Sequence, residues 1–225
     1  MKTEILFEDK LIAVCLKPAG IISQGSQSGE DMISILNGHF IQSGSDARAF
    51  PVHRLDRETA GLMVYAKNSA AAARLSKQAE QNEIKKRYFA ILRGVPEEKS
   101  GVLKDLLFRD KQKNKSYAVN RMRKGVREAS LEYDVICEKD GTALLDILLH
   151  TGRTHQIRVQ FASRKMPLLG DGKYGGKGGK GGKLALFARS LEFRHPESGE
   201  LLSFSAKPDS QTDPWQIFSA ELEAF

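Results

Sequence analysis

Two polar stretches of this 225-residue sequence hold the residue types that acid–base or nucleophilic chemistry requires. The first, residues 52–61, places one carboxylate, Asp56, between Arg54 and Arg57 and runs directly into an apolar stretch. A loop that enters a rigid sheet can hold a carboxylate in a fixed position, and arginines beside it can contact phosphates or bases. From residue types alone, however, an aspartate between two arginines more often forms a structural ion pair.

The second stretch lies much later in the chain and joins an apolar run to an expected helix. We expect Thr154 to cap that helix, because a threonine oxygen can accept from the first free N–H groups. An uncovered helix end next to Arg153 suits phosphate binding. Arg158 falls one turn further on, on the same expected face as Thr154, within reach of a group held above that end.

The elements that position these stretches are mostly strands. Short apolar, β-branched or aromatic runs predict strands at residues 11–16, 62–66, 88–92, 131–137, 143–149 and 201–204. Fewer helices are expected: one that Asn68 or Ser69 caps and that runs to Gln81, one from Thr154 to Arg164, and one over residues 214–223.

Consecutive strands predict antiparallel pairing. Residues 131–137 and 143–149, with a turn at 138–141 between them, have the pattern of a hairpin. An α+β fold with a mostly antiparallel sheet follows. Without an internal repeat or a Pro/Ser linker, we expect one continuous domain over residues 1–225.

Two segments stand out by their positive charge. Residues 104–127 hold lysines and arginines with little apolar content, which predicts a solvated basic excursion. Residues 175–183 repeat Gly-Gly-Lys but fail the phosphate-loop pattern, since Leu184 stands where Ser or Thr is required. For this glycine loop we favour a mobile surface loop over a direct RNA contact.

Composition narrows the partners and the compartment. A formal net charge of +7 favours polyanions, with nucleic acid the first candidate. Cys15 and Cys137 each lie among apolar residues, the usual setting of a reduced, buried thiol. The acidic N-terminal segment and the absence of a long apolar run predict a cytoplasmic protein without a membrane span.

Histidines carry a separate expectation. His53 and His155 lie in the two polar stretches, but no pair has zinc-ligand spacing with cysteine or carboxylate partners. We therefore expect no metal site, and we expect these two side chains to hold loops by hydrogen bonds.

Several motifs together resemble the RluA-type pseudouridine synthases, RNA uridine isomerases, from about Ile5 to Pro208. They are, in order, Lys17-Pro18-Ala19-Gly20; His53-Arg54-Leu55-Asp56-x-x-Thr59-x-Gly61; Lys86-Arg87-Tyr88-x-Ala90; Gly152-Arg153-Thr154-His155-Gln156-Ile157-Arg158-Val159; and Gly170-Asp171-x-x-Tyr174-Gly175. The sequence begins directly at the catalytic region, so we expect no S4-like RNA-binding domain in front of it.

The resemblance implies the pseudouridine synthase fold, whose flanking helices and loops form an RNA-binding cleft. It implies Asp56 as the essential aspartate, Tyr88 as the residue that stacks on the base, and Arg158 as the basic partner of Asp56. An enzyme that isomerises a uridine in place must hold the detached base in a closed pocket and does not need a cofactor, so we expect no cofactor. The implied partner is RNA, either ribosomal or transfer RNA, and we expect contacts with it from Arg54, Arg57, Arg153, Thr154, His155 and Gln156. We expect a monomer.

Two other classes of function compete with this one. A non-catalytic RNA-binding module would use the same basic residues, but a carboxylate such as Asp56 opposes phosphate binding. A metal-dependent nuclease would need clustered carboxylates, and near Asp56 the sequence offers only Glu58. Activity in excess chelator separates a synthase from such a nuclease.

Overall fold

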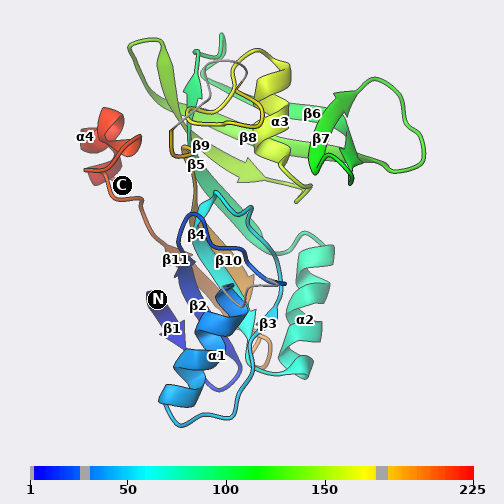
Figure 1. Cartoon of the computed structure of the whole chain (residues 1–225), viewed down its shortest axis with the longest axis vertical. Helices are drawn as coiled ribbons and strands as arrows, with labels where there is room; N and C mark the ends of the chain where they lie inside the picture. The colour runs from blue at the N-terminus through cyan, green and yellow to red at the C-terminus, as the bar shows by residue number, and fades with distance from the viewer. Residues whose placement is uncertain (1–2, 26–30, 176–181) are drawn as a thin grey trace. The chain divides into compact units, whose positions relative to one another are not determined.

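The structure, a computed structural model, describes residues 3–25, 31–175 and 182–225. The chain forms two compact units, the first made of Met1–Lys86 and Ala188–Ala206 and the second of Arg87–Phe187 and Lys207–Phe225. Strands β5 (Lys85–Arg93) and β10 (Leu186–Arg194) cross from one unit to the other (Figure 1). The single-domain boundaries 1–225 stay a prediction.

The first unit combines a sheet in the order β1-β2-β4-β10 with two helices (Figure 1). Strand β3 pairs with β4, and β11 pairs with β10. The bounds are β1 (Ile5–Glu8), β2 (Ile12–Lys17), α1 (Met32–Gln42), β3 (Phe50–Pro51), β4 (Ala60–Ala66), α2 (Ser69–Glu80) and β11 (Leu201–Ser205).

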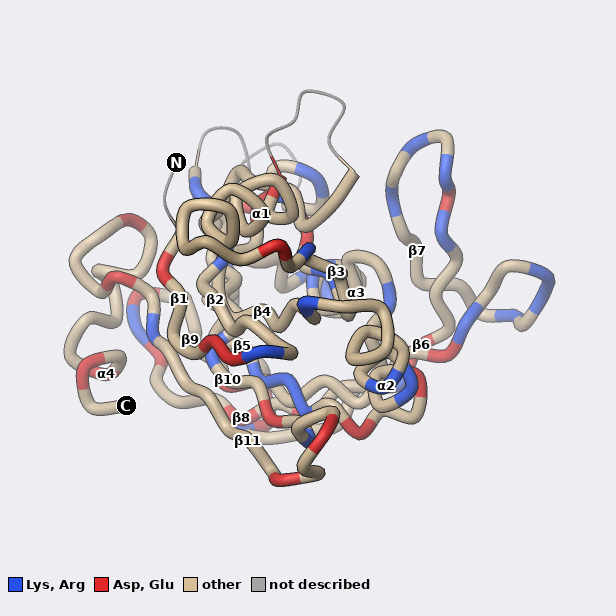
Figure 2. Tube along the Cα trace, turned by 90° about the horizontal axis from the view of Figure 1, so that it is seen from below, with Lys and Arg blue, Asp and Glu red and all other residues tan. Residues whose placement is uncertain are grey.

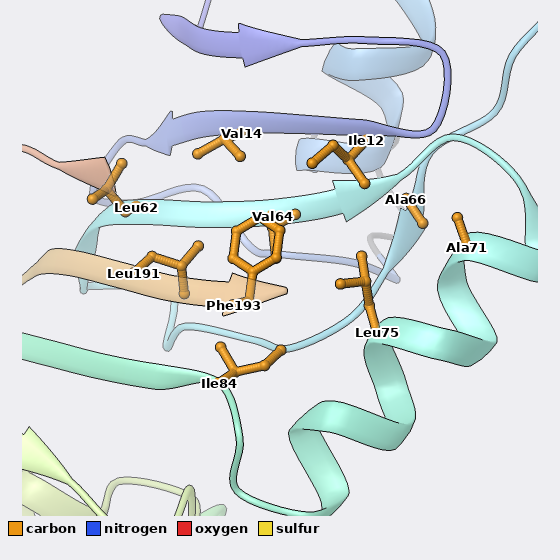
Figure 3. Close-up of a cluster of buried hydrophobic side chains, with 10 residues drawn as sticks. All are labelled: Ile12, Val14, Leu62, Val64, Ala66, Ala71, Leu75, Ile84, Leu191 and Phe193. Atoms are coloured by element: carbon orange, nitrogen blue, oxygen red, sulfur yellow. The ribbon is translucent and has the colours of Figure 1, made fainter. Parts of the chain in front are cut away.

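Helix α2 covers one face of this sheet. Its Ala71 and Leu75 pack against side chains of β2, β4 and β10 in one buried cluster (Figure 3). Alternate residues of β4, Leu62 and Val64, enter the cluster because successive strand side chains point to opposite faces. Each large apolar side chain buried in this way contributes roughly 1.5–3 kcal/mol to folding.

The second unit holds strands in the order β5-β9-β8-β6-β7 (Figure 1). Its other bounds are β6 (Ser100–Asp110), β7 (Lys115–Val119), β8 (Val126–Lys139), β9 (Thr142–Leu149), α3 (Gln156–Ser163), η2 (Trp215–Phe218) and α4 (Ser219–Glu223). The predicted hairpin is confirmed as β8–β9, whose turn residues Asp140 and Gly141 both have positive φ, as tight hairpin turns favour.

The antiparallel pairings β1–β2, β2–β4, β6–β7, β6–β8 and β8–β9 confirm the predicted sheet type. Most of residues 111–125 are exposed, as expected for a solvated basic excursion. The segment is not a free loop, however, because most of residues 104–127 form the end of β6, β7 and the start of β8. Lysines and arginines are spread along these strands and their connecting loops (Figure 2). Charged residues flank short apolar runs such as 106–108, so the segment lacks the apolar–polar alternation that would have predicted strands.

The helix predictions had mixed outcomes. Helix α2 begins after Asn68, whose side chain accepts from the Ala71 N–H at 2.8 Å as expected. The Thr154 cap was wrong: the residue before α3 is His155, in a left-handed conformation (φ 56°) and without a side-chain cap bond. Helix α1 was not predicted, although Asp31 caps it by accepting from the Ser34 N–H at 2.8 Å.

The two cysteines differ in burial. Cys15 is fully buried as expected, and burial raises the pKa of its thiol to about 12. The prediction that Cys137 is buried was wrong: it is half-buried, and its Sγ donates to the Glu221 carboxylate at 3.3 Å. A break in the β8–β9 register between Val135 and Cys137 turns the strand there, which the sequence pattern does not reveal.

Within the described ranges, no helix is both long enough and apolar enough to cross a lipid bilayer. The glycine-lysine loop predicted at residues 175–183 lies largely outside the described residues, since 176–181 are not among them.

Candidate active site

The loop that carries Asp56 lies in the first unit, between β3 and β4. Its main chain is held on both sides of the aspartate. Before it, the Ser23 hydroxyl accepts from the Leu55 N–H and donates to the Leu55 carbonyl, both at 3.0 Å. After it, the Thr59 N–H donates to the Asp56 carbonyl at 3.1 Å, closing a turn. Asp56 therefore projects from backbone that is tied down rather than from a free loop.

A buried lysine supports the same turn. Lys17, at the end of β2, is 1% exposed, and its ammonium donates to the carbonyls of Pro18 (2.8 Å), Ile21 (2.6 Å) and Arg57 (3.2 Å). Burial lowers the pKa of Lys17 to about 8, and the negative charge of Asp56 opposes that shift. In the sequence, Lys17 stands out only as part of a motif and as a charged residue at the end of an apolar strand.

Two further hydrogen bonds join Gly20 to Arg57. The Gly20 N–H donates to the Arg57 carbonyl at 2.8 Å, and the Arg57 Nε donates to the Gly20 carbonyl at 2.9 Å. Arg54 and Arg57 themselves are exposed, so their guanidinium groups lie where a polyanion can reach them.

His53 holds the loop by a hydrogen bond, as expected. Its Nε2 accepts from the Val64 N–H at 3.3 Å, which places the ring proton on Nδ1. Burial and the charge of Lys86 lower the pKa of His53 to about 3, so the ring is neutral near pH 7. In the described part of the chain, the buried Nδ1 of His53 and the buried Oγ1 of Thr59 make no hydrogen bond.

Gly61 ends the motif for a steric reason. Its φ is +121°, and a Cβ there would lie 2.4 Å from the Ala188 carbonyl oxygen of β10. A residue with a side chain would push these two strands apart, so glycine lets the Asp56 loop enter the sheet closely.

The second unit carries Tyr88 on β5, where the side chain is buried. Its neighbour Arg87 points to the other face of the strand and pairs with Asp146, with Nη2 at 2.8 Å from Oδ2. Within the Lys86-Arg87-Tyr88 motif, Arg87 therefore fixes the strand through its ion pair, and Tyr88 points to the opposite face.

Arg158 lies on α3 and is paired with Asp171. Its Nε donates to Asp171 Oδ2 at 2.7 Å and its Nη2 to Oδ1 at 2.8 Å, and both side chains are almost completely buried. Burial alone would raise the pKa of Asp171, but the hydrogen bonds and the charge of Arg158 hold it below its usual value. Asp171 was not predicted as a partner. The predicted pairing of Arg158 with Asp56 concerns residues of different units and stays a prediction.

The residues before α3 make bonds within the protein. Gln156 is buried, its Oε1 accepts from the Thr151 hydroxyl (2.8 Å) and the Arg153 N–H (3.0 Å), and its Nε2 donates to the Ser130 carbonyl (3.1 Å). His155 is also buried, with Nδ1 2.9 Å from the Tyr174 hydroxyl, which confirms its expected loop-holding role. RNA contacts of these two side chains stay predictions.

Arg153 and Thr154 are more accessible. Arg153 is exposed, and its Nε donates to the Glu128 carbonyl at 2.9 Å. Thr154 is half-buried, and its carbonyl accepts from the Ser116 hydroxyl at 2.7 Å. Of the four predicted RNA-contacting residues in this stretch, these two are the ones that solvent reaches most readily.

No group of three or more His, Cys, Asp or Glu side chains within residues 3–25, 31–175 and 182–225 is arranged to hold a metal ion.

A family model described as RNA pseudouridylate synthase matches residues 11–163, a span that contains Asp56, Tyr88 and Arg158. The chain belongs to the RNA pseudouridylate synthase family. The resemblance drawn from the motifs is thereby confirmed at the level of the family.

Curated relatives of the chain agree with the family match. It is 34% identical over 203 residues to the "Uncharacterized RNA pseudouridine synthase YhcT" of Bacillus subtilis (strain 168), covering 88% of this chain and 66% of the relative. It is 35% identical to the "Ribosomal large subunit pseudouridine synthase D" of Nitrosomonas europaea, covering 92% of this chain and 62% of the relative. The chain thus spans about two thirds of the length of these curated relatives.

A solved structure supports the fold. "Human RNA Pseudouridylate Synthase Domain Containing 4" superposes with a TM-score of 0.79 at 24% identity, covering 98% of this chain and 93% of that one. The expected pseudouridine synthase fold is therefore confirmed.

Proposed function

We propose that this chain isomerises uridine in RNA to pseudouridine, with Asp56 as the reacting carboxylate. The observation that carries the proposal is the anchoring of the Asp56 turn, which Ser23 holds before the aspartate and Lys17 after it. A carboxylate that acts on a bound ribose must keep its position while the base leaves and returns, and a tied backbone provides this. The family match supports the same reaction.

The reaction breaks the N-glycosidic bond, turns the uracil and rejoins it to the ribose through carbon. An ionised Asp56 can attack the anomeric carbon as a nucleophile, or remove a ribose proton as a base to form a glycal. In both routes the bond from the anomeric carbon to the uracil nitrogen breaks and a bond from the same carbon to a uracil carbon forms. That uracil carbon then loses its proton, and the freed nitrogen gains one. The carboxylate leaves the anomeric carbon in the first route and returns the proton to the ribose in the second, so it ends unchanged.

Tyr88 and Arg158 take the remaining catalytic roles in the proposal. Tyr88 offers a flat ring for the detached uracil and a hydroxyl that can move a proton after the base has turned. Arg158 is the basic partner of Asp56 and fixes its rotamer. Asp56 belongs to the first unit and the other two residues to the second, and we propose that one reaction uses all three.

The proposed substrate is a uridine in structured ribosomal or transfer RNA. One relative is named for the large ribosomal subunit, which favours ribosomal RNA. A uridine must leave its stack to react, at a cost of a few kcal/mol that is least in loops and distorted stems. We propose that the exposed Arg54 braces the vacated space and that Arg57 and Arg153 contact phosphates.

The decisive experiment replaces Asp56 with Asn, which keeps the shape of the side chain and removes its charge. Purified Asp56→Asn and wild-type protein are incubated with ribosomal and transfer RNA from a strain that lacks the enzyme, and pseudouridine is mapped on each RNA. We expect the variant to fold and to bind RNA but to form no pseudouridine.

Glu58→Gln provides the matched control, because it removes an exposed carboxylate two positions away in the same loop. We expect this control to keep its activity, and excess chelator to leave the wild type unaffected. Turnover by Asp56→Asn would refute the mechanism, and loss of wild-type activity in chelator would favour a metal-dependent reaction.

A further inference from the structure

The Asp171 carboxylate that pairs with Arg158 accepts four hydrogen bonds. Besides the two bonds from Arg158, Asp171 Oδ1 accepts from the backbone N–H groups of Lys173 and Tyr174, both at 2.9 Å. A carboxylate held by four donors cannot rotate without breaking several of them. The guanidinium that meets it along two parallel bonds is fixed in the same plane.

The turn that presents Asp171 is itself rigid. Gly170 has a φ of +72°, and a Cβ on it would lie 2.0 Å from the Lys183 carbonyl oxygen. The Asp171 carbonyl accepts from the Gly175 N–H at 2.7 Å, and its N–H donates to the Leu168 carbonyl at 3.2 Å. Asp171 thus stands on a backbone that is bonded on both sides.

Tyr174 packs beside the Arg158–Asp171 ion pair. Its ring lies against the Arg158 guanidinium, 5.5 Å from ring centre to Cζ. Its hydroxyl accepts from the Ser116 N–H of β7 at 2.8 Å and lies 2.9 Å from His155 Nδ1. Arg158 is therefore bounded by a carboxylate on one edge and by an aromatic ring on one face, both from the Gly170–Gly175 motif.

A purely structural ion pair would not need this degree of burial. Helix α3 also ends in an Arg164–Asp105 pair, with two bonds of 2.9 and 3.2 Å, whose side chains are 32% and 18% exposed, against 1% and 0% for Arg158 and Asp171. Burying a charged pair completely costs desolvation that apolar residues of the same volume avoid, so stability alone explains the Arg158–Asp171 pair poorly.

We propose that Asp171 is a positioning residue for the reaction, acting through Arg158. This inference rests on the proposed function, in which Arg158 supports the reacting carboxylate. By holding the Nε edge of the guanidinium, Asp171 selects one rotamer of Arg158 and sets the direction in which the rest of the group points. Displacing a catalytic support by about 1 Å can slow a reaction by roughly a hundredfold.

The test compares Asp171→Asn with Asp105→Asn, which breaks the other Arg–Asp pair on the same helix. We expect Asp171→Asn to lower kcat by about tenfold to a hundredfold while RNA affinity stays within about threefold of wild type. Asp105→Asn should lower the melting temperature yet leave kcat within about twofold. Equal reductions of kcat in both variants, or unchanged kcat in Asp171→Asn, would overturn the proposal.

A double-mutant cycle adds a measurement whose result would not change if Asp171 had only a structural role. Lysine cannot form the two-bond pair with Asp171, so Asp171→Asn should cost about twofold or less in kcat when Arg158→Lys is already present. An undiminished reduction of kcat in that background would show that Asp171 does not act through Arg158. If Asp171→Asn does not fold, Asp171→Glu keeps the charge, displaces the carboxylate and carries the same expectations.

One measurement is independent of activity. In the RNA-free protein we expect a sharp Arg158 Nε–H signal by ¹⁵N NMR, which shifts and broadens in Asp171→Asn but not in Asp105→Asn. If the wild type forms no pseudouridine on any RNA tested, the proposed function fails and this signal alone decides whether Asp171 positions Arg158. An identical Arg158 signal in wild type and Asp171→Asn would overturn the inference.

Discussion

At the scale of single residues, the position of Asp56 is set mainly by side chains that do not react. The Ser23 hydroxyl holds Leu55, and the Lys17 ammonium holds Arg57, so the backbone is tied on either side of the aspartate. Lys17 is buried despite its charge, which is tolerated because three carbonyl oxygens surround the ammonium.

Replacing Lys17 with Met tests this anchoring. The substitution keeps most of the side-chain volume but removes the ammonium donor from the Pro18, Ile21 and Arg57 carbonyls, of which Arg57 keeps the Gly20 N–H. A buried acceptor left unpaired costs about 1–3 kcal/mol. We expect Lys17→Met to unfold at a lower denaturant concentration and to lower kcat, because the Asp56 turn loosens. Lys10→Met, at an exposed position between β1 and β2, is the control and should change neither quantity. Wild-type stability of Lys17→Met would contradict the anchoring.

Tyr88 provides a second prediction at this scale. Stacking of a base on an aromatic ring contributes about 1–3 kcal/mol and does not need the hydroxyl. We therefore expect Tyr88→Phe to bind substrate RNA nearly as tightly as wild type and Tyr88→Leu to bind about fivefold to a hundredfold more weakly, measured by filter binding. Equal affinities for the two variants would exclude stacking. The ratio of kcat between Tyr88→Phe and wild type then reports what the hydroxyl contributes.

At the scale of elements, β6, β7 and β8 project a basic surface. The loops at the two ends of β7 carry exposed Lys111, Lys113, Arg121 and Lys124 (Figure 2). Strand pairing holds these charges in a defined arrangement, whereas a free loop would have to lose conformational freedom on binding. The hairpin also contacts the Arg158 region, because Ser116 of β7 bonds both Tyr174 and Thr154.

Neutralising two of these lysines should weaken RNA binding without affecting the fold. For Lys111→Gln/Lys113→Gln we expect lower affinity and a plot of log affinity against log salt that is less steep by about 0.7–0.9 for each phosphate that the variant no longer neutralises. Lys10→Gln/Lys77→Gln removes the same charge from exposed positions of the first unit and is the control. If both double variants bind RNA equally weakly, net charge rather than the hairpin attracts the RNA.

At the scale of the whole molecule, ion pairs with lowered carboxyl pKa values occur in both units. In the first, Glu8 lies 2.6 Å from Lys67 and 2.7 Å from His39, and Asp9 lies 2.9 Å from His195. Burial raises the pKa of Glu8 and Asp9, but their hydrogen bonds and charged partners lower it further than burial raises it. In the second unit, Arg158 has the same net effect on Asp171.

Acid should therefore destabilise the folded chain. A carboxyl with a lowered folded pKa contributes stability that is complete above its unfolded pKa of about 4 and is lost as pH falls through the folded value. We expect Glu8→Gln/Asp9→Asn to melt below wild type at pH 7, with a difference that shrinks below about pH 4. Melting curves at several pH values measure it, with Asp46→Asn, at an exposed position, as control. A pH-independent difference would contradict this linkage.

The sequence alone determined which residues are candidates for chemistry, and which family they indicate. Asp56, Tyr88 and Arg158 lie in motifs of fixed spacing, and the family model spans all three. Local sequence patterns also predicted helix α2, where Asn68 caps an alanine-rich run, and the β8–β9 hairpin, whose turn needs positive φ. These features depend on contacts between residues close in the chain, so their pattern is visible without a fold.

Only the tertiary structure decided the partners of those residues. The contacts of Lys17 with Arg57 and of Arg158 with Asp171 join residues that are distant in sequence or belong to different elements, and no period or cap signals them. Tertiary contacts also formed strands β6 and β7 from a charged segment that lacks the alternation typical of a strand. Pairing with a neighbouring strand satisfies the backbone of such a segment, and that neighbour is supplied by the fold.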